Sequence, residues 1–110
     1  MARHPDLPDI GSMVEVLRGR DKGLFGIVVG FDGNRFLLIA DGDKRKAERP
    51  KKKNALHVRK LPYTASDVVE ALKVDGKVTN ARLRYAVRQF DEMRQGMTTV
   101  ATEEGGARNG

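Results

Sequence analysis

Short apolar runs separated by turn-forming residues occupy the N-terminal part of this 110-residue chain and restrict the folds it can adopt. The runs are residues 13–17, 24–31, 35–40 and 55–59. β-Branched and aromatic side chains are frequent in them, as is typical of strands. Gly26 and Gly30 lie inside the second run, where residues without a Cβ allow a sheet to bend sharply. The spacing predicts a small antiparallel barrel or sandwich, and the internal glycines favour the barrel.

The residues between the runs predict how the strands connect. Residues 32–34 (Asp-Gly-Asn) are typical of a hairpin turn, because they adopt positive φ at low cost. A further strand is expected over residues 44–49, whose polar side chains suit a sheet edge facing solvent or a ligand. We expect residues 51–53 to form a loop, followed by a closing strand in which Leu56 and Val58 face the core. This makes five strands in all.

The period of the apolar residues changes to a helical one after residue 62. A short helix is predicted over residues 67–73, with Thr64 or Ser66 as its N-cap. A second helix is predicted to begin after the N-cap Thr79 and to end near Gly96.

The second helix has one apolar face, formed by Leu83, Val87 and Phe90 at spacings of four and three. We expect this face to pack on the barrel or on a partner. The expected plan is a flexible arm at residues 1–9, the barrel at 10–61, a two-helix appendage at 62–95 and a disordered tail at 96–110.

The positive charge of the chain is concentrated in one segment. The formal net charge is +6, yet residues 43–60 alone contain nine basic and two acidic residues. Such a concentration costs self-repulsion and predicts a polyanionic partner such as RNA, DNA or an acidic surface. A solvated loop without a partner is the alternative explanation. The segment includes Pro50 and lacks Phe and Trp, so it does not predict an amphipathic helix that attaches to membranes.

The sequence gives no support for an enzyme. It has no Cys, no phosphate-binding Gly-rich motif and no paired-His metal motif. His57 stands alone in a predicted strand, and no carboxylates form an obvious catalytic pair. We therefore expect no cofactor, no metal and no small-molecule substrate. Without an apolar span or a signal sequence, the protein is expected to be cytoplasmic.

Two parts of the sequence together resemble a known family. The segment Gly19-Arg20-Asp21-Lys22-Gly23 followed by Phe25-Gly26-Ile27-Val28-Val29 resembles the KOW motif of ribosomal proteins and transcription elongation factors. Residues 38–53, with Ala-Asp-Gly and the lysine triplet, look like the second half of short bacterial KOW-domain RNA-binding proteins. These are similar to the archaeal and eukaryotic large-subunit ribosomal protein family numbered fourteen. The resemblance implies an SH3-like barrel that contacts structured RNA, in particular ribosomal RNA.

The residues expected to bind RNA lie in the first turn, in the basic segment and at its end. They are Arg18, Gly19, Arg20, Lys22, Gly23, Lys44, Arg45, Lys46, Arg49, Lys51, Lys52, Lys53, Arg59 and Lys60. The glycines let backbone N–H groups approach a phosphate, arginines form forked phosphate contacts, and lysines act as point charges. Asp21 is expected to stabilise the turn through neighbouring backbone N–H groups. Few aromatic side chains are left for base stacking, because Phe25, Phe31 and Phe36 are expected to lie in the core.

The main hypothesis is a non-enzymatic RNA-binding protein that is part of the ribosome or associates with it. Ribosomal proteins are possible additional partners. A protein-interaction module that binds RNA polymerase or a ribosomal protein is the alternative, and it would require an exposed apolar patch. A helix-turn-helix arrangement of the two helices, with Arg82, Arg84 and Arg88 facing DNA, is a weaker alternative.

Overall fold

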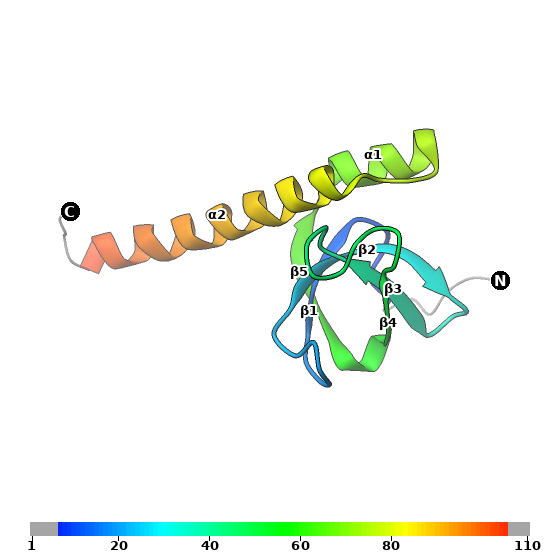
Figure 1. The fold of residues 1–110 in the computed structure, drawn as a ribbon. Coiled ribbons are helices and arrows are strands. Elements are labelled where there is room, and N and C mark those ends of the chain that lie inside the picture. Colours follow the sequence, from blue (N-terminus) through cyan, green and yellow to red (C-terminus); the bar gives the residue numbers. More distant parts are fainter. Residues whose placement is uncertain (1–6, 106–110) are drawn as a thin grey trace.

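Five antiparallel strands form one curled sheet. The computed structural model describes residues 7–105, and it describes side chains as far as residue 96. The strands are β1 (Ser12–Val16), β2 (Phe25–Asp32), β3 (Phe36–Ala40), β4 (Lys51–Asn54) and β5 (Val58–Thr64). Their order in the sheet is β4-β3-β2-β1-β5. The edge strands β4 and β5 are joined by the 3-10 helix η1 (Ala55–His57), so the sheet curls back on itself (Figure 1). The predicted five-stranded fold is confirmed.

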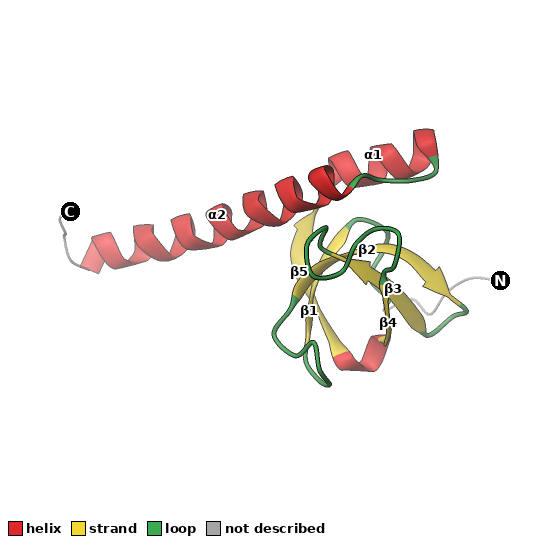
Figure 2. Cartoon of the chain, in the orientation of Figure 1, coloured by secondary structure: helices red, strands yellow, loops and turns green. Residues whose placement is uncertain are grey.

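Two helices follow the sheet and cover one of its faces. They are α1 (Ser66–Asp75) and α2 (Asn80–Gly105), and Figure 2 shows both on the same side of the strands. Thr79 Oγ1 accepts a hydrogen bond from Arg82 N at 3.1 Å, which confirms the predicted cap of the second helix. Leu83 and Phe90 are buried and Val87 is half-buried, so the predicted apolar face packs on the barrel.

The alternation of side chains along the strands creates two separate cores. Val14 and Val16 point into the curl of the sheet, where they pack with Val28, Leu37 and Ile39. The second core lies between the outer face of the sheet and the helices, and it contains Met13, Ile27, Ala40, Val68, Leu83 and Phe90. Full burial of each large aliphatic side chain contributes about 1.5–3 kcal/mol. The helices are therefore an integral part of the packed structure.

The charged fourth strand lies later in the sequence than predicted. Residues 44–49 form a loop, whereas Lys51, Lys52 and Lys53, predicted as a loop, pair with Ile39, Leu38 and Leu37 as strand β4. Lysines have a low strand propensity, but an edge strand needs a partner on only one side and is protected from aggregation by its charges. The hydrogen bonds to β3 therefore outweigh the low strand propensity of the three lysines.

The closing strand also differs from the prediction. Residues 55–57 form η1, capped by Asn54 Oδ1, which accepts a hydrogen bond from Leu56 N at 2.9 Å. Leu56, predicted to face the core, is 84% exposed because the 3-10 turn directs it outward. β5 begins at Val58 and continues to Thr64, past residue 61 where the barrel was expected to end.

The helix and chain ends differ from the predictions in three places. The residue at the N-cap of α1 is Ala65, which has no side-chain oxygen to accept a bond. Leu7 and Pro8 are buried, although residues 1–9 were predicted as a flexible arm; residues 1–6 lie outside the described part. Helix α2 passes Gly96 and continues to Gly105, because glycine inside a helix costs only about 1 kcal/mol relative to alanine. The predicted disorder of residues 106–110 concerns residues that the structure does not describe.

Candidate RNA-binding surface

The turn between β1 and β2 holds three exposed basic side chains on a tight backbone. Gly19 and Gly23 adopt φ of 89° and 92°, as predicted for residues that allow left-handed backbone. Backbone bonds from Lys22 N to Gly19 O (3.1 Å) and from Gly23 N to Val16 O (2.8 Å) close the turn. Arg18, Arg20 and Lys22 extend into solvent. We call residues 18–23 the KOW turn.

The loop of residues 41–49, which we call the basic loop, is ordered by the carboxylate of Asp41. Asp41 is buried, and its Oδ1 accepts hydrogen bonds from Asp43 N at 3.0 Å and Arg45 N at 2.8 Å. In return, Arg45 O accepts bonds from the backbone N–H groups of Asp41 and Gly42, both at 3.0 Å. The hydrogen bonds to the Asp41 carboxylate therefore fix the backbone of the loop, while Lys44 and Lys46 remain exposed.

Helix α2 holds the basic loop from its other side. Asn80 Oδ1 accepts a hydrogen bond from Ala47 N at 2.7 Å, and Asn80 Nδ2 donates to the carboxylate of Glu48 at 3.0 and 3.2 Å. Arg84 Nη1 donates to Gly42 O at 2.8 Å. The hydrogen bond from Asn80 is the main cause that lowers the pKa of Glu48, and the Glu48 backbone bond and the charge of Lys46 lower it further.

Gly42 allows the loop and the helix to approach each other closely. Its φ is 81°, and a Cβ at this position would lie 2.4 Å from the carbonyl oxygen of Asn80. No other residue type fits this contact without a shift of the backbone. The start of α2 and the basic loop therefore form one unit.

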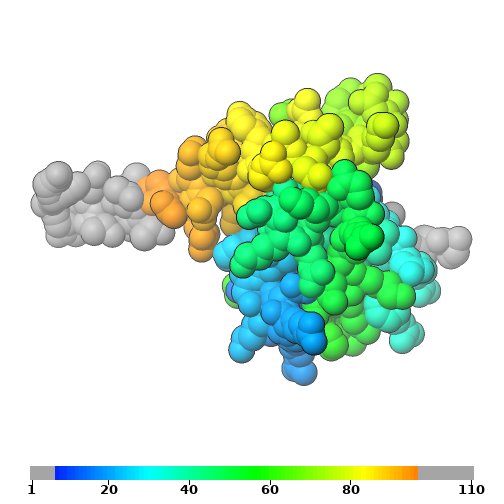
Figure 3. All heavy atoms as spheres, viewed as in Figure 1, coloured from blue at the N-terminus to red at the C-terminus, as the bar shows by residue number. Residues whose placement is uncertain are grey.

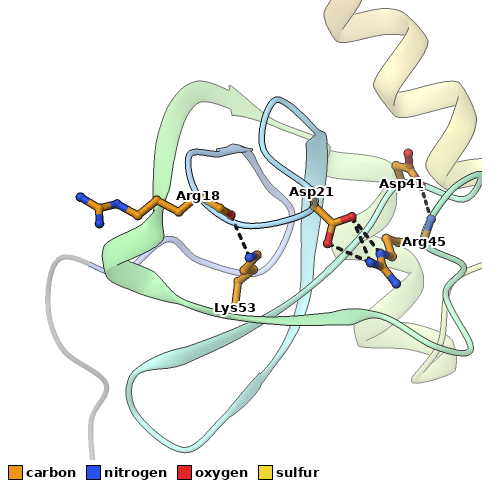
Figure 4. A network of polar contacts seen from close by, with 5 residues as sticks. All are labelled: Arg18, Asp21, Asp41, Arg45 and Lys53. Atoms are coloured by element: carbon orange, nitrogen blue, oxygen red, sulfur yellow. Dashed lines mark hydrogen bonds and ion pairs between the residues drawn. The ribbon is translucent and has the colours of Figure 1, made fainter.

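An ion pair joins the KOW turn to the basic loop. Both carboxylate oxygens of Asp21 accept hydrogen bonds from the Arg45 guanidinium at 2.9–3.3 Å, as Figure 4 shows. The two side chains are 13% and 32% exposed. This corrects the prediction for Asp21, whose carboxylate binds an arginine of another segment. The Nε and Nη2 groups of Arg45 are used by Asp21, which leaves Nη1 for any contact with a phosphate.

Strand β4 is attached to the same turn. Lys53 Nζ donates to the backbone carbonyl of Arg18 at 2.9 Å, while the Arg18 side chain points away from the barrel (Figure 4). Lys52 Nζ lies 3.3 Å from Asp32 Oδ2 and 5.1 Å from the ring centroid of Phe36. Lys51 is half-buried. These contacts give the lysine triplet a structural role at the sheet edge.

The last two predicted residues lie elsewhere. Arg59 and Lys60 belong to β5, at the opposite end of the sheet from β4. Arg59 forms an ion pair with Glu15 on the neighbouring strand β1, and Lys60 is exposed. The sequence alone suggests one continuous basic segment, but the fold separates its end from its beginning.

The remaining cations belong to the KOW turn and the basic loop, two segments that the Asp21–Arg45 pair joins. They are Arg18, Arg20, Lys22, Lys44, Lys46 and Arg49. Within residues 7–96, none of these side chains forms an ion pair with a carboxylate within 4.0 Å, although the charge of Lys46 acts on Glu48. Figure 3 shows the loop (green) and the turn (blue) on the same exposed face. We call this set the basic face.

Several residues that build the surface were not identified from the sequence. Asp41, Asn80 and Arg84 position the loop, and only the turn-forming Asp-Gly at residues 41 and 42 was visible as a local signal. The contact between Ala47 and Asn80 joins residues 33 positions apart, beyond the reach of any local pattern. Arg82, considered as a DNA-facing residue, forms an ion pair with Asp67 of α1 at 3.5 Å, and Arg84 binds Gly42.

The described residues contain neither a metal-binding cluster nor a membrane-spanning helix. No group of three or more His, Asp or Glu side chains between residues 7 and 96 could hold a metal ion. Within the described part, no helix has the length and apolar character needed to cross a membrane.

Comparison with known proteins agrees with this architecture. Residues 10–40, which comprise β1, the KOW turn, β2 and β3, match the KOW motif. The chain belongs to the KOW-motif proteins, and no catalytic family is indicated. It is 34% identical over 71 residues to "Putative ribosome-binding protein YbzG" of Bacillus subtilis (strain 168). The similar region covers 64% of this chain and 96% of that relative.

Proposed function

We propose that this protein binds the ribosome by contacting phosphate groups of folded ribosomal RNA through the basic face, and that it catalyses no reaction. The single observation that carries the proposal is the pairing of Asp21 with Arg45. It holds two cationic segments together, and their remaining bases form no ion pair within 4.0 Å in the described chain. The similarity to a relative named for ribosome binding supports the ribosome as the partner. The resemblance of residues 38–53 to short bacterial KOW-domain RNA-binding proteins supports RNA as the surface that is contacted.

Phosphates of structured RNA suit this face better than single-stranded bases. Phe25 and Phe31 pack against the two cores, as predicted, and Phe36 lies beneath Lys52. No row of exposed aromatic rings is therefore present between residues 7 and 96 for successive bases to stack on. Recognition then depends on the shape and charge of a folded RNA. A ribosomal partner also agrees with the cytoplasmic location expected from the sequence.

The test is co-sedimentation with ribosomes. A tagged chain in a cell lysate is expected to migrate with ribosomal particles on a sucrose gradient, and to return to the top of the gradient after ribonuclease treatment or at high salt. The variant Lys44→Glu/Lys46→Glu is expected to stay at the top. The matched control Lys73→Glu/Lys77→Glu changes the charge equally at exposed positions in and after α1 and is expected to behave like the wild type. Equal sedimentation of both variants would refute the proposal.

A second candidate function is docking to a protein, and the exposed apolar residues at η1 favour it. Leu56 is 84% exposed and Leu17 is 38% exposed, and Leu17 N donates to His57 O at 2.8 Å, which places them at the same end of the barrel. In this case Leu56→Asp would abolish ribosome association, and the charge reversal at Lys44 and Lys46 would leave it intact.

A further inference from the structure

A hollow of about 490 Å³ lies between the KOW turn and helix α2. This volume is within the range of about 300–1,000 Å³ typical of sites for small molecules. Its walls come from three segments: the KOW turn with the start of β2, the basic loop, and the middle of α2. The lining side chains that matter for its chemistry are Arg20, Lys22, Lys44, Leu24, Phe25 and Val87.

The acidic groups of the hollow already have hydrogen-bond partners within the chain, and two of them, Asp21 and Asp91, are paired with an arginine. Asp21 is bound by the Arg45 guanidinium, and Asp41 by the backbone N–H groups of Asp43 and Arg45. Asp91 accepts a hydrogen bond from Arg94 at 2.6 Å. These carboxylates therefore offer little repulsion to an anion.

The basic groups of the hollow have no such partners. Arg20, Lys22 and Lys44 are exposed, and none of them has a carboxylate partner within residues 7–96. The unsatisfied charge of the hollow is thus positive. An anionic ligand such as a phosphate group complements this charge.

The inner wall of the hollow is apolar. Leu24, Phe25 and Val87 are half-buried there, and Phe90 behind them is buried. The rings of Phe25 and Phe90 lie 5.7 Å apart, with the Arg94 guanidinium 4.7 Å from the Phe25 centroid. A free phosphate would leave this wall in contact with water, whereas a flat apolar group next to a phosphate would cover it.

We propose that this hollow receives one unstacked nucleotide of the bound RNA, with its base against Leu24, Phe25 and Val87 and its phosphate against Arg20, Lys22 and Lys44. The inference rests on the proposed RNA binding and adds a local requirement to it. The rest of the basic face contacts phosphates of any folded RNA, and the hollow selects RNA in which one base is extruded.

Three RNA probes test the inference. The first is a continuous duplex, the second is the same duplex with one unpaired adenosine, and the third has an abasic nucleotide at the unpaired position. The adenosine probe is expected to bind at least about 5-fold more tightly than either of the others, measured by fluorescence anisotropy, because contact of one base with an apolar wall has this effect or a larger one. The abasic probe separates the base from the altered backbone of a bulge.

A variant that fills the hollow gives a second, independent test. Val87→Trp is expected to remove the preference for the adenosine probe over the abasic probe. The control Val74→Trp adds the same bulk at an exposed position of α1, outside the hollow, and should keep the preference. Thermal unfolding of both variants shows whether they are folded. The three-probe experiment uses the wild-type protein, so it remains valid even if a variant does not fold.

The outcomes distinguish this inference from the proposed function. Equal affinity for the three probes, or equal affinity for the adenosine and abasic probes, would overturn the inference and leave the RNA-binding function in place. Failure to bind any of the probes and any ribosomal particle would overturn both.

Discussion

Arg45 joins the two segments that form the basic face. Its guanidinium holds Asp21 of the KOW turn, and its backbone N–H and carbonyl groups are bound within the basic loop. Without this side chain the exposed lysines would still be present, but the KOW turn and the basic loop would lose the contact that holds them together. The residue therefore positions the basic face.

A double-mutant cycle measures this contact. Asp21→Asn and Arg45→Met are each expected to lower the free energy of unfolding, and the double variant is expected to be more stable than the sum of the two losses implies. We expect a coupling of about 1 kcal/mol, because the pair is bidentate but partly exposed. Urea denaturation of the four proteins provides the values. Additive losses, within about 0.3–0.5 kcal/mol, would contradict the contact.

Gly42 permits a second test at the level of one residue. Gly42→Ala is expected to be destabilising by roughly 1–3 kcal/mol more than Gly33→Ala, as measured by urea denaturation. Both glycines have positive φ, so each substitution carries about 1–2 kcal/mol of backbone strain. Only at Gly42 would the added Cβ meet another backbone, and at Gly33 the space is open. Equal losses would show that α2 does not contact the loop in this way.

At the scale of elements, the start of α2 acts as a support for the basic loop. Asn80→Ala removes the acceptor for Ala47 N and the donor for Glu48 without changing any charge. We expect faster hydrogen exchange at the Ala47 amide and weaker binding to ribosomal RNA, with a loss of about 1–2 kcal/mol in unfolding free energy. Asn34→Ala, in the exposed hairpin between β2 and β3, is the control and should change neither quantity appreciably. Unchanged exchange at Ala47 in the Asn80 variant would refute this role.

The same contact predicts a pH dependence. The pKa of Glu48 is lowered mainly by the Asn80 hydrogen bond, so it should rise toward the ordinary value in Asn80→Ala. A lowered pKa means that the contact stabilises the fold fully above the ordinary glutamate value of about 4.3, and that this stabilisation is lost as the pH falls through the lower pKa of the folded state. NMR titration of the Glu48 carboxyl carbon in both proteins measures the shift. Identical titration midpoints would contradict the prediction.

Elements with local determinants could be predicted from the sequence. The hairpin at residues 32–34 and the Thr79 cap depend on a few neighbouring residues, and both are present in the structure. Strand β4 could not be predicted, because its lysines form a strand only through pairing with β3. The outward orientation of Leu56 depends on the 3-10 turn that closes the sheet, which also has no clear local signal.

At the scale of the whole molecule, the candidate site was only partly predictable for the same reason. The sequence shows how many bases lie in residues 43–60, but their availability depends on partners that are distant in the chain. Asp21 and Arg45 are 24 positions apart in the sequence, and the ion-paired residues Glu15 and Arg59 are 44 positions apart. The fold decides which cations form contacts within the structure and which remain exposed without an ion-pair partner in the described residues.

The open cations also predict the salt dependence of binding. If about five phosphates are neutralised, the slope of log K against log salt is roughly −3 to −4, which corresponds to about two decades of affinity between 50 and 200 mM salt. Lys22→Gln is expected to make the slope less steep by about 1, and Lys73→Gln on α1 should leave it unchanged. Fluorescence anisotropy with one RNA duplex at several salt concentrations tests this. A slope near zero for the wild type would exclude phosphate contacts as the source of affinity.

The attachment of the basic loop at both of its sides has a further consequence for the kinetics of complex formation. Its backbone is held by Asp41, Asn80 and Arg84 in the absence of any partner. If the protein binds RNA as proposed, association loses little conformational entropy in this segment. The association rate is then governed by long-range attraction between opposite charges, and it is expected to fall steeply with ionic strength without a slow rearrangement step.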